Sequence, residues 1–104
     1  MDLGLNDKVA MVTGASRGLG RAMAAALAAE GVRLSLCARG ADALHSFATE
    51  LKAGGHQVIA EAADVADSAA MERWRDNTVS AFGGVDILVN NAGGARLGTL
   101  TQTR

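Results

Sequence analysis

Four short apolar runs alternate with three longer helix-like patterns along this chain of 104 residues. The runs cover residues 9–12, 32–37, 57–63 and 86–90. Runs of this length are typical of strands, and the longer patterns carry apolar residues at helical spacing. Strands that alternate with helices predict a parallel sheet with helices on both faces. Right-handed crossovers then predict a doubly wound α/β fold with strand order 3-2-1-4.

The expected helices cover residues 18–30, 41–53 and 67–82, and each ends at a glycine stop signal. Asp67 or Ser68 can cap the third helix, because short polar side chains accept hydrogen bonds from the free N–H groups of a first turn. The inward side of the first helix is predicted to hold Leu19, Met23 and Leu27. The inward side of the third is predicted to hold Met71, Trp74, Val79 and Phe82.

Composition excludes several classes of function. Apolar residues make up 49% of the chain, which favours one globular domain over disorder. The net charge of −1 is scattered, so neither nucleic acid nor a membrane is expected as a partner. Cys37 is the single cysteine, so we expect no disulfide and no metal site, and its position predicts a buried strand residue. With no signal-peptide pattern and no apolar run long enough to span a bilayer, a cytoplasmic protein is expected.

The stretch VTGASRGLG, residues 12–20, forms the turn from the first expected strand into the first helix. A helix N-terminus presents free N–H groups and the positive end of the dipole, which attract anions. Gly14 would permit a tight turn, Gly18 would let the backbone approach a pyrophosphate, and Gly20 would let helix and strand pack closely. The hydroxyl of Ser16 can donate to a phosphate oxygen. A glycine-rich turn without a ligand is the alternative interpretation.

Three motifs at the ends of the expected strands resemble those of the short-chain dehydrogenase/reductase family. Residues 13–20, Thr-Gly-Ala-Ser-Arg-Gly-Leu-Gly, are similar to the cofactor loop of that family. Asp64 and Val65, after the third strand, resemble its Asp-Val element. Residues 90–93, Asn-Asn-Ala-Gly, resemble the element that follows its fourth strand. The motifs occur in the family's order and together span nearly the whole chain.

The resemblance implies an NAD(P)-dependent oxidoreductase with a Rossmann-type fold. The residues that would hold the pyrophosphate are Gly14, Ser16, Gly18, Leu19 and Gly20. Asp64 and Val65 would bracket the adenine, with Asp64 accepting from its amino group. The residues that would line the path to the nicotinamide-side ribose are Asn90, Ala92 and Gly93, with Asn91 as a support for the sheet. A helix cap at Asp64 and simple turn chemistry at the two asparagines are the alternatives.

The end of the second strand predicts the choice of cofactor. NAD is usually selected there by a carboxylate that binds the ribose 2′-OH. Ala38 stands at that position and Arg39 follows it, and an arginine can bind a 2′-phosphate bidentately. Arg17 in the glycine loop could contact the phosphate from the other side. We therefore predict NADP(H) in preference to NAD(H); a solvated pair of Arg39 with Asp42 and a free Arg17 are the alternatives.

The family's catalytic serine and Tyr-x-x-x-Lys pair have no match here. The chain contains no tyrosine, its only lysines are Lys8 and Lys52, and no serine follows the fourth strand. We therefore expect residues 1–104 to be the N-terminal, cofactor-binding portion of a longer, homo-oligomeric reductase for an alcohol or carbonyl substrate, and to be inactive alone. A non-catalytic dinucleotide- or ADP-ribose-binding module is the alternative, and a scaffold that pairs through its open sheet is a weaker one. The longer reductase is favoured because the fourth strand would be an apolar sheet edge, which the tail, residues 96–104, is too short and polar to cover.

Overall fold

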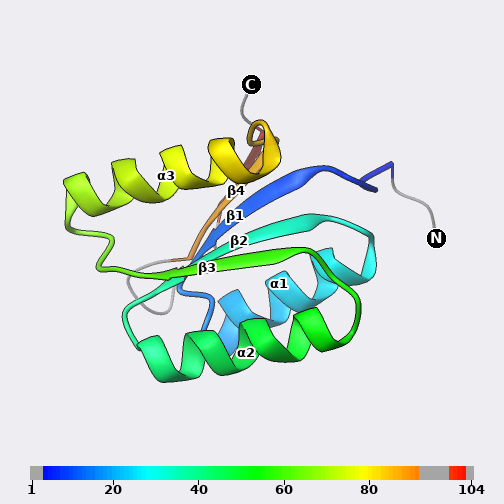
Figure 1. Cartoon of the computed structure of the whole chain (residues 1–104), viewed down its shortest axis with the longest axis horizontal. Helices are drawn as coiled ribbons and strands as arrows, with labels where there is room; N and C mark the ends of the chain where they lie inside the picture. Colours follow the sequence, from blue (N-terminus) through cyan, green and yellow to red (C-terminus); the bar gives the residue numbers. More distant parts are fainter. Residues whose placement is uncertain (1–3, 92–98, 103–104) are drawn as a thin grey trace.

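The computed structural model of the chain describes residues 4–91 and 99–102. Its elements are β1 Val9–Thr13, α1 Gly18–Ala29, β2 Arg33–Ala38, α2 Ala41–Ala53, β3 Val58–Ala62, α3 Ser68–Phe82, β4 Ile87–Asn90 and β5 Thr99–Gln102. The strands form one sheet in the order β3-β2-β1-β4-β5. The first four strands are parallel, as predicted. Helices α1 and α2 cover one face and α3 covers the other, which confirms the doubly wound arrangement (Figure 1).

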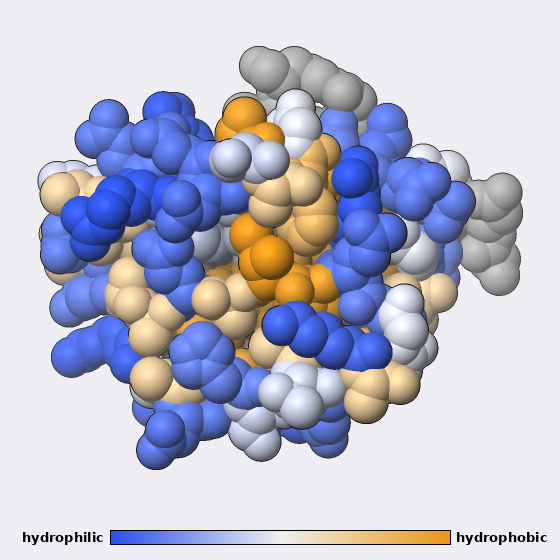
Figure 2. Space-filling model, in the orientation of Figure 1, coloured by the Kyte–Doolittle hydropathy of each residue, from blue (hydrophilic) through white to orange (hydrophobic). Residues whose placement is uncertain are grey.

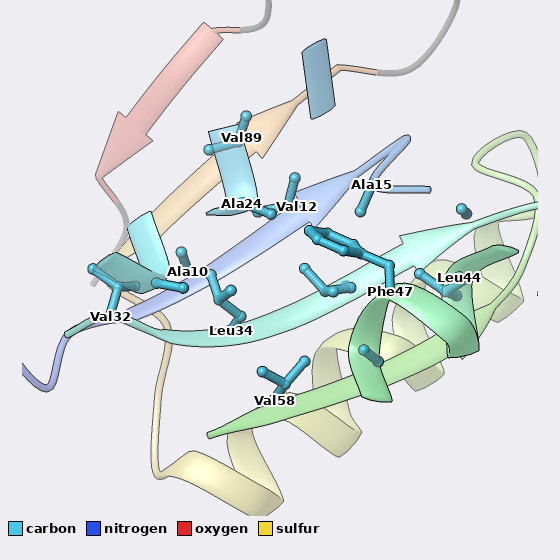
Figure 3. Packing of buried hydrophobic residues seen from close by; sticks show 14 of the residues in the cluster. Ala10, Val12, Ala15, Ala24, Val32, Leu34, Leu44, Phe47, Val58 and Val89 are labelled. Atoms are coloured by element: carbon cyan, nitrogen blue, oxygen red, sulfur yellow. The ribbon is translucent and has the colours of Figure 1, made fainter. Parts of the chain in front are cut away.

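The larger core lies between the sheet and the pair α1 and α2. Figure 3 shows Leu44 and Phe47 of α2 directed at the strands, with side chains from β1, β2, β3 and β4 on the same face. Leu34, Leu36 and Leu44 are fully buried, and each contributes roughly 1.5–3 kcal/mol relative to an exposed position. In the space-filling view, apolar residues gather in a band across the middle of the molecule, between hydrophilic residues on both sides (Figure 2).

A smaller core lies on the opposite face, beneath α3. It is built from Met11 of β1, Cys37 of β2 and Trp74 of α3. Cys37 is fully buried, as predicted, so β2 is covered on both faces. Near-continuous burial of this kind is characteristic of parallel strands between two helical layers. No helix in the described part of the chain is long and apolar enough to cross a membrane.

The predicted inward face of α1 is wrong by about one position. Its buried residues are Gly20, Ala24 and Ala28, while Leu19 is 39% exposed. Met23 and Leu27 are only partly buried at the margin of the core. Small residues occupy the contact because they let the helix axis approach the sheet closely, which larger side chains would prevent.

The predicted inward face of α3 is also partly wrong. Trp74 is buried as predicted, but its neighbours on that face are Ala70 and Thr78, and Val79 is 44% exposed. The Thr78 hydroxyl donates to the Trp74 carbonyl at 2.8 Å and lies 2.6 Å from Ser35 Oγ in β2. A buried threonine with hydrogen-bond partners therefore takes the place that hydropathy assigned to valine.

The expectation that the fourth strand would be an uncovered edge is wrong for the described residues. β5 pairs antiparallel with β4, with Val89 opposite Leu100 and Asn90 opposite Thr99. The short, polar segment of residues 96–104 gave no sign from its composition that it would cover this edge. Strand pairing uses backbone N–H and C=O groups, so four residues suffice whatever their polarity.

Candidate cofactor-binding site

Two glycines set the shape of the loop between β1 and α1. Gly14 has a positive φ of 60°, and a Cβ built on it would lie 2.7 Å from the backbone oxygen of Asn91. A Cβ on Gly20 would overlap the carbonyl oxygen of Gly14. Both positions therefore exclude a side chain, which accounts for the tight turn and for the close packing of α1. Gly18 also has a positive φ, of 61°, but faces open space, so its surroundings leave room for a group outside the protein.

The first turn of α1 has no internal anion or cap. Its N-cap is Arg17, whose side chain makes no capping hydrogen bond, and the turn contains no acidic residue. Helix α3 differs, because the Asp67 carboxylate accepts from the N–H of Ala70 at 3.1 Å. The prediction that Asp67 or Ser68 caps α3 is thus confirmed for Asp67. The N–H groups at the start of α1 remain available to a bound anion.

The glycine loop is joined to the end of β2. The backbone N–H of Ala15 donates to the carbonyl of Cys37 at 3.1 Å. This bond brings Ser16 and Arg17 beside the β2 end, where Arg39 follows the last strand residue. Ser16 is half-buried and Arg17 is exposed, and neither side chain has a hydrogen bond or ion pair with another described residue. Both polar groups are therefore free to contact a ligand.

The ends of β2 and β3 lie side by side. Ala38 is in register with Ala62, and the N–H of Ala63 donates to the Ala38 carbonyl at 3.0 Å. The residues that follow, Arg39 and Asp64, form a long ion pair of 3.9 Å between Nε and Oδ2. Arg39 thus pairs with Asp64 and not with Asp42. Its side chain is 81% exposed, so it has room to turn towards a ligand.

Asp64 is held by its own turn and does not cap α3. Its Oδ1 accepts from the backbone N–H of Ala66 at 2.9 Å, which leaves Oδ2 directed at Arg39. The neighbouring Val65 is 40% exposed. An oriented carboxylate acceptor beside an exposed apolar side chain is an arrangement that suits an adenine ring and its amino group.

Thr13 connects the β1 and β4 ends, a role that the sequence interpretation missed. Its buried Oγ1 accepts from the backbone N–H of Asn91 at 2.8 Å. The same hydroxyl lies 3.3 Å from Asn90 Oδ1 and 3.4 Å from the Val89 carbonyl, so it can donate its proton to either. A polar residue that ends a fully apolar strand was the available signal. Thr13 fixes the turn that follows β4.

Asn91 packs behind the glycine loop, consistent with the support role expected for it. Its side-chain amide approaches both Gly14 and Gly20, and its backbone oxygen approaches Gly14. Its Oδ1 is buried without a hydrogen-bond partner among the described residues. Asn90, by contrast, is exposed at the end of β4. Ala92 and Gly93, predicted to line the cofactor path, lie outside the described residues.

An apolar hollow of about 330 Å³ opens beside these strand ends, on the α3 side of the sheet. Its lining residues are Met11, Thr13, Val65, Met71, Trp74, Arg75, Val85, Leu88 and Asn90. The hollow thus brings Val65 and Asn90 together, two residues predicted from different strands to contact the cofactor. It lies at the carboxyl ends of the strands, where ligands bind in open α/β sheets.

Cys37 is no candidate nucleophile. Burial, together with the nearby Glu61 carboxylate, raises the pKa of its thiol to about 11. A protonated, buried thiol is chemically inert. The described residues also contain no group of three histidine, cysteine or acidic side chains that could hold a metal ion.

A family model described as short chain dehydrogenase matches residues 8–104. This chain belongs to the short-chain dehydrogenase family. The predicted resemblance is therefore confirmed.

Curated relatives of this short-chain dehydrogenase chain act on different substrates. D-threitol dehydrogenase of Mycolicibacterium smegmatis is 42% identical over 98 residues, which is 92% of this chain and 37% of that protein. L-rhamnose 1-dehydrogenase (NAD(P)(+)) of Azotobacter vinelandii is 46% identical, over 86% of this chain and 36% of that protein. The chain thus spans about two fifths or less of the length of the relatives it matches.

Solved structures of the family share the fold. The L-sorbose reductase of Gluconobacter frateurii, complexed with NADPH and L-sorbose, has a TM-score of 0.87 and 44% identity, over 92% of this chain and 37% of its own. A short-chain dehydrogenase/reductase of Burkholderia phymatum in complex with NAD has a TM-score of 0.79 and 37% identity, over 81% of this chain and 30% of its own. The family relationship therefore supports a nicotinamide dinucleotide as ligand and does not choose between its two forms.

Proposed function

We propose that these residues form the NADP(H)-binding portion of a short-chain reductase that interconverts an alcohol and a carbonyl compound. The observation that carries the proposal is the end of β2, which is bonded to the glycine loop and carries the exposed Arg39 where a carboxylate is absent. NAD is usually selected by a carboxylate at this place, whereas an arginine there can bind a 2′-phosphate. When bound, the nicotinamide supplies or accepts the hydride.

The remaining contacts follow the three strand ends. The free N–H groups at the start of α1 and the Ser16 hydroxyl would bind the pyrophosphate. Gly14, Gly18, Leu19 and Gly20 would let it approach the backbone. Arg17 would contact the 2′-phosphate from the side opposite Arg39.

Asp64 and Val65 would bracket the adenine, and Asn90 with Ala92 and Gly93 would line the nicotinamide side. The open space around Gly18 and the exposed Val65 fit such a ligand. These assignments depend on the family resemblance and on the positions of the strand ends.

The chain as given supplies binding without catalysis in this proposal. Proton transfer in the family needs a tyrosine, and this sequence has none. The substrate-binding and catalytic residues would belong to the longer parent, which would act as a homo-oligomer in the cytoplasm. A purely non-catalytic module is the less favoured alternative, because the relatives reported above are dehydrogenases and a reductase.

The test is a titration of the chain with NADPH and with NADH, in which binding is measured by fluorescence or calorimetry. We expect NADPH to bind about tenfold or more tightly, since a charge-assisted hydrogen bond to phosphate contributes about 1.5–3 kcal/mol. Arg39→Gln should remove most of this preference, with Arg17 left as the remaining cation, and should leave NADH affinity within about twofold. Arg73→Gln, the same change at an exposed position of α3, should leave both affinities unchanged. Equal affinity, or tighter binding of NADH, would refute the proposal.

A further inference from the structure

The sheet places Arg39 and Asp64 at adjacent strand ends. Ala38 and Ala62 are partners in the β2–β3 register, and the N–H of Ala63 donates to the Ala38 carbonyl. Arg39 follows Ala38 and Asp64 follows Ala63, so this bond holds the two backbones together. Their side chains meet in an ion pair of 3.9 Å between Nε and Oδ2.

The side chains of Asp64 and Arg39 differ in how firmly they are held. Asp64 is anchored, since its Oδ1 accepts from the Ala66 N–H, and half of its side chain is exposed. Arg39 has no other hydrogen-bond or ion-pair partner among the described residues and is 81% exposed. The carboxylate is thus a fixed acceptor, and the guanidinium is the part that can move.

We propose that Asp64 is a positioning residue for Arg39 and thereby limits the discrimination between dinucleotides with and without a 2′-phosphate. This inference rests on the proposed function. The pair competes with a 2′-phosphate wherever phosphate binding draws the guanidinium away from Asp64, so the fraction of unpaired Arg39 then sets the apparent affinity for the phosphorylated ligand. A ligand without the 2′-phosphate gains no contact when Arg39 leaves Asp64.

The size of the effect follows from the exposure of the pair. Exposed ion pairs of this kind are weak, so the paired state can reduce affinity for a 2′-phosphate by only about two- to fivefold. The pair therefore reduces the preference for NADP(H) without reversing it. Salt should diminish the effect further, because both charges are accessible to solvent.

The experiment measures the affinities of 2′,5′-ADP and 5′-ADP for the wild-type chain and for Asp64→Asn. Asparagine keeps one oxygen for the Ala66 N–H and replaces the charged oxygen that faces Arg39 with an amide NH2. Any change at the adenine is common to both ligands and cancels in the ratio of their affinities. We expect the ratio of the two affinities to rise about two- to fivefold in favour of 2′,5′-ADP. Asp42→Asn, which removes a carboxylate near Arg39 in sequence but outside the pair, should leave the ratio unchanged. Circular dichroism and urea unfolding of each variant establish that it is folded.

A double-mutant cycle separates positioning of Arg39 from direct repulsion of the phosphate by Asp64. In an Arg39→Gln background, Asp64→Asn should no longer change the ratio. A change that persists there would overturn the inference, as would an equal effect of Asp64→Asn on both ligands in the wild-type background. A wild-type chain with no preference for 2′,5′-ADP would instead refute the proposed function, and a wild-type chain that binds neither ligand would refute both.

Discussion

Single backbone contacts decide how closely β1, α1 and β4 approach one another. Gly20 places its Cα hydrogens against the Gly14 carbonyl, while the Asn91 backbone oxygen occupies the space beside Gly14. The Thr13 hydroxyl then fixes the N–H of Asn91. A turn assembled in this way has no room for a methyl group and leaves its outer surface open to a ligand.

Gly20→Ala should therefore destabilise the chain. The new methyl group would meet a backbone oxygen, which cannot rotate away, and overpacking of this kind costs about 1–3 kcal/mol. Urea unfolding, monitored by Trp74 fluorescence, measures the loss in the free energy of unfolding. Gly84→Ala is the matched control, because no atom lies within 4 Å of its built Cβ. Equal stabilities of the two variants would contradict the described packing.

Cys37 gives the chain a pH dependence at the alkaline end. Its folded pKa of about 11 lies above the ordinary value of 9.0, so the folded state keeps the thiol proton after the unfolded state has lost it. Stability is therefore unaffected by this group below about pH 9 and falls between about pH 9 and 11. Two pKa units correspond to a loss on the order of 2 kcal/mol.

Cys37→Ala should remove this part of the alkaline fall. The comparison is the change in urea midpoint between about pH 8.5 and 10.5 for each protein, since the slope with pH isolates the thiol. Every other side chain is the same in the two proteins, and the sequence has no tyrosine to interfere. Parallel slopes would show that burial does not raise the thiol pKa.

At the scale of elements, α3 is fixed to the sheet by a closed chain of hydrogen bonds. The Trp74 Nε1–H donates to Ser35 Oγ at 2.8 Å, and the Ser35 and Thr78 hydroxyls lie 2.6 Å apart. Thr78 then donates to the Trp74 carbonyl. Each of the three groups is buried and has a partner, so the network determines which side of α3 faces β2.

Ser35→Ala should destabilise the chain by about 1–3 kcal/mol, because it leaves the buried Trp74 N–H without an acceptor. Ser80→Ala removes the same hydroxyl from an exposed position of α3 and should change stability by no more than about 0.5 kcal/mol. The two are compared by urea unfolding. If Ser35→Ala proved as neutral as Ser80→Ala, the network would not hold the helix.

The same elements show which features the sequence could predict. Helix α2 has the predicted bounds, since Leu44 and Phe47 mark its buried side unambiguously. The buried faces of α1 and α3 were misplaced, because hydropathy ranks Leu19 and Val79 above the Ala24 and Thr78 that occupy the contacts. Close packing and side-chain hydrogen bonds decide those faces, and neither is visible in a pattern of apolar residues.

At the scale of the whole molecule, the site arises where the chain changes faces. Helix α1 leaves β1 on one side of the sheet, and α3 leads into β4 on the other (Figure 1). The crevice at the carboxyl ends of β1 and β4 is the place where α/β sheets bind ligands. The order of elements predicted the strand order, and the family resemblance identified the motifs at the strand ends.

Two features of the site were beyond a prediction from sequence. Pairing of Arg39 with Asp64 depends on the β2–β3 register, which residue types do not specify. The polar Thr13 at the end of an apolar strand is visible in the sequence, but its partner, the N–H of Asn91, lies near the other end of the chain and is fixed only by the fold. Likewise, the pairing of β5 with β4 uses backbone groups that every sequence offers, so nothing in the polar tail indicated it.

A backbone NMR titration of the chain with NADPH tests most directly whether the ends of β1, β2 and β3 bind the dinucleotide. We expect the largest shifts in amide resonances in residues 14–20, at Arg39 and at Asp64 and Val65. Amides at the far end of α1 and throughout α2 should change little. Shifts confined to other parts of the sheet, or no shifts from a folded chain at millimolar NADPH, would contradict binding at these strand ends.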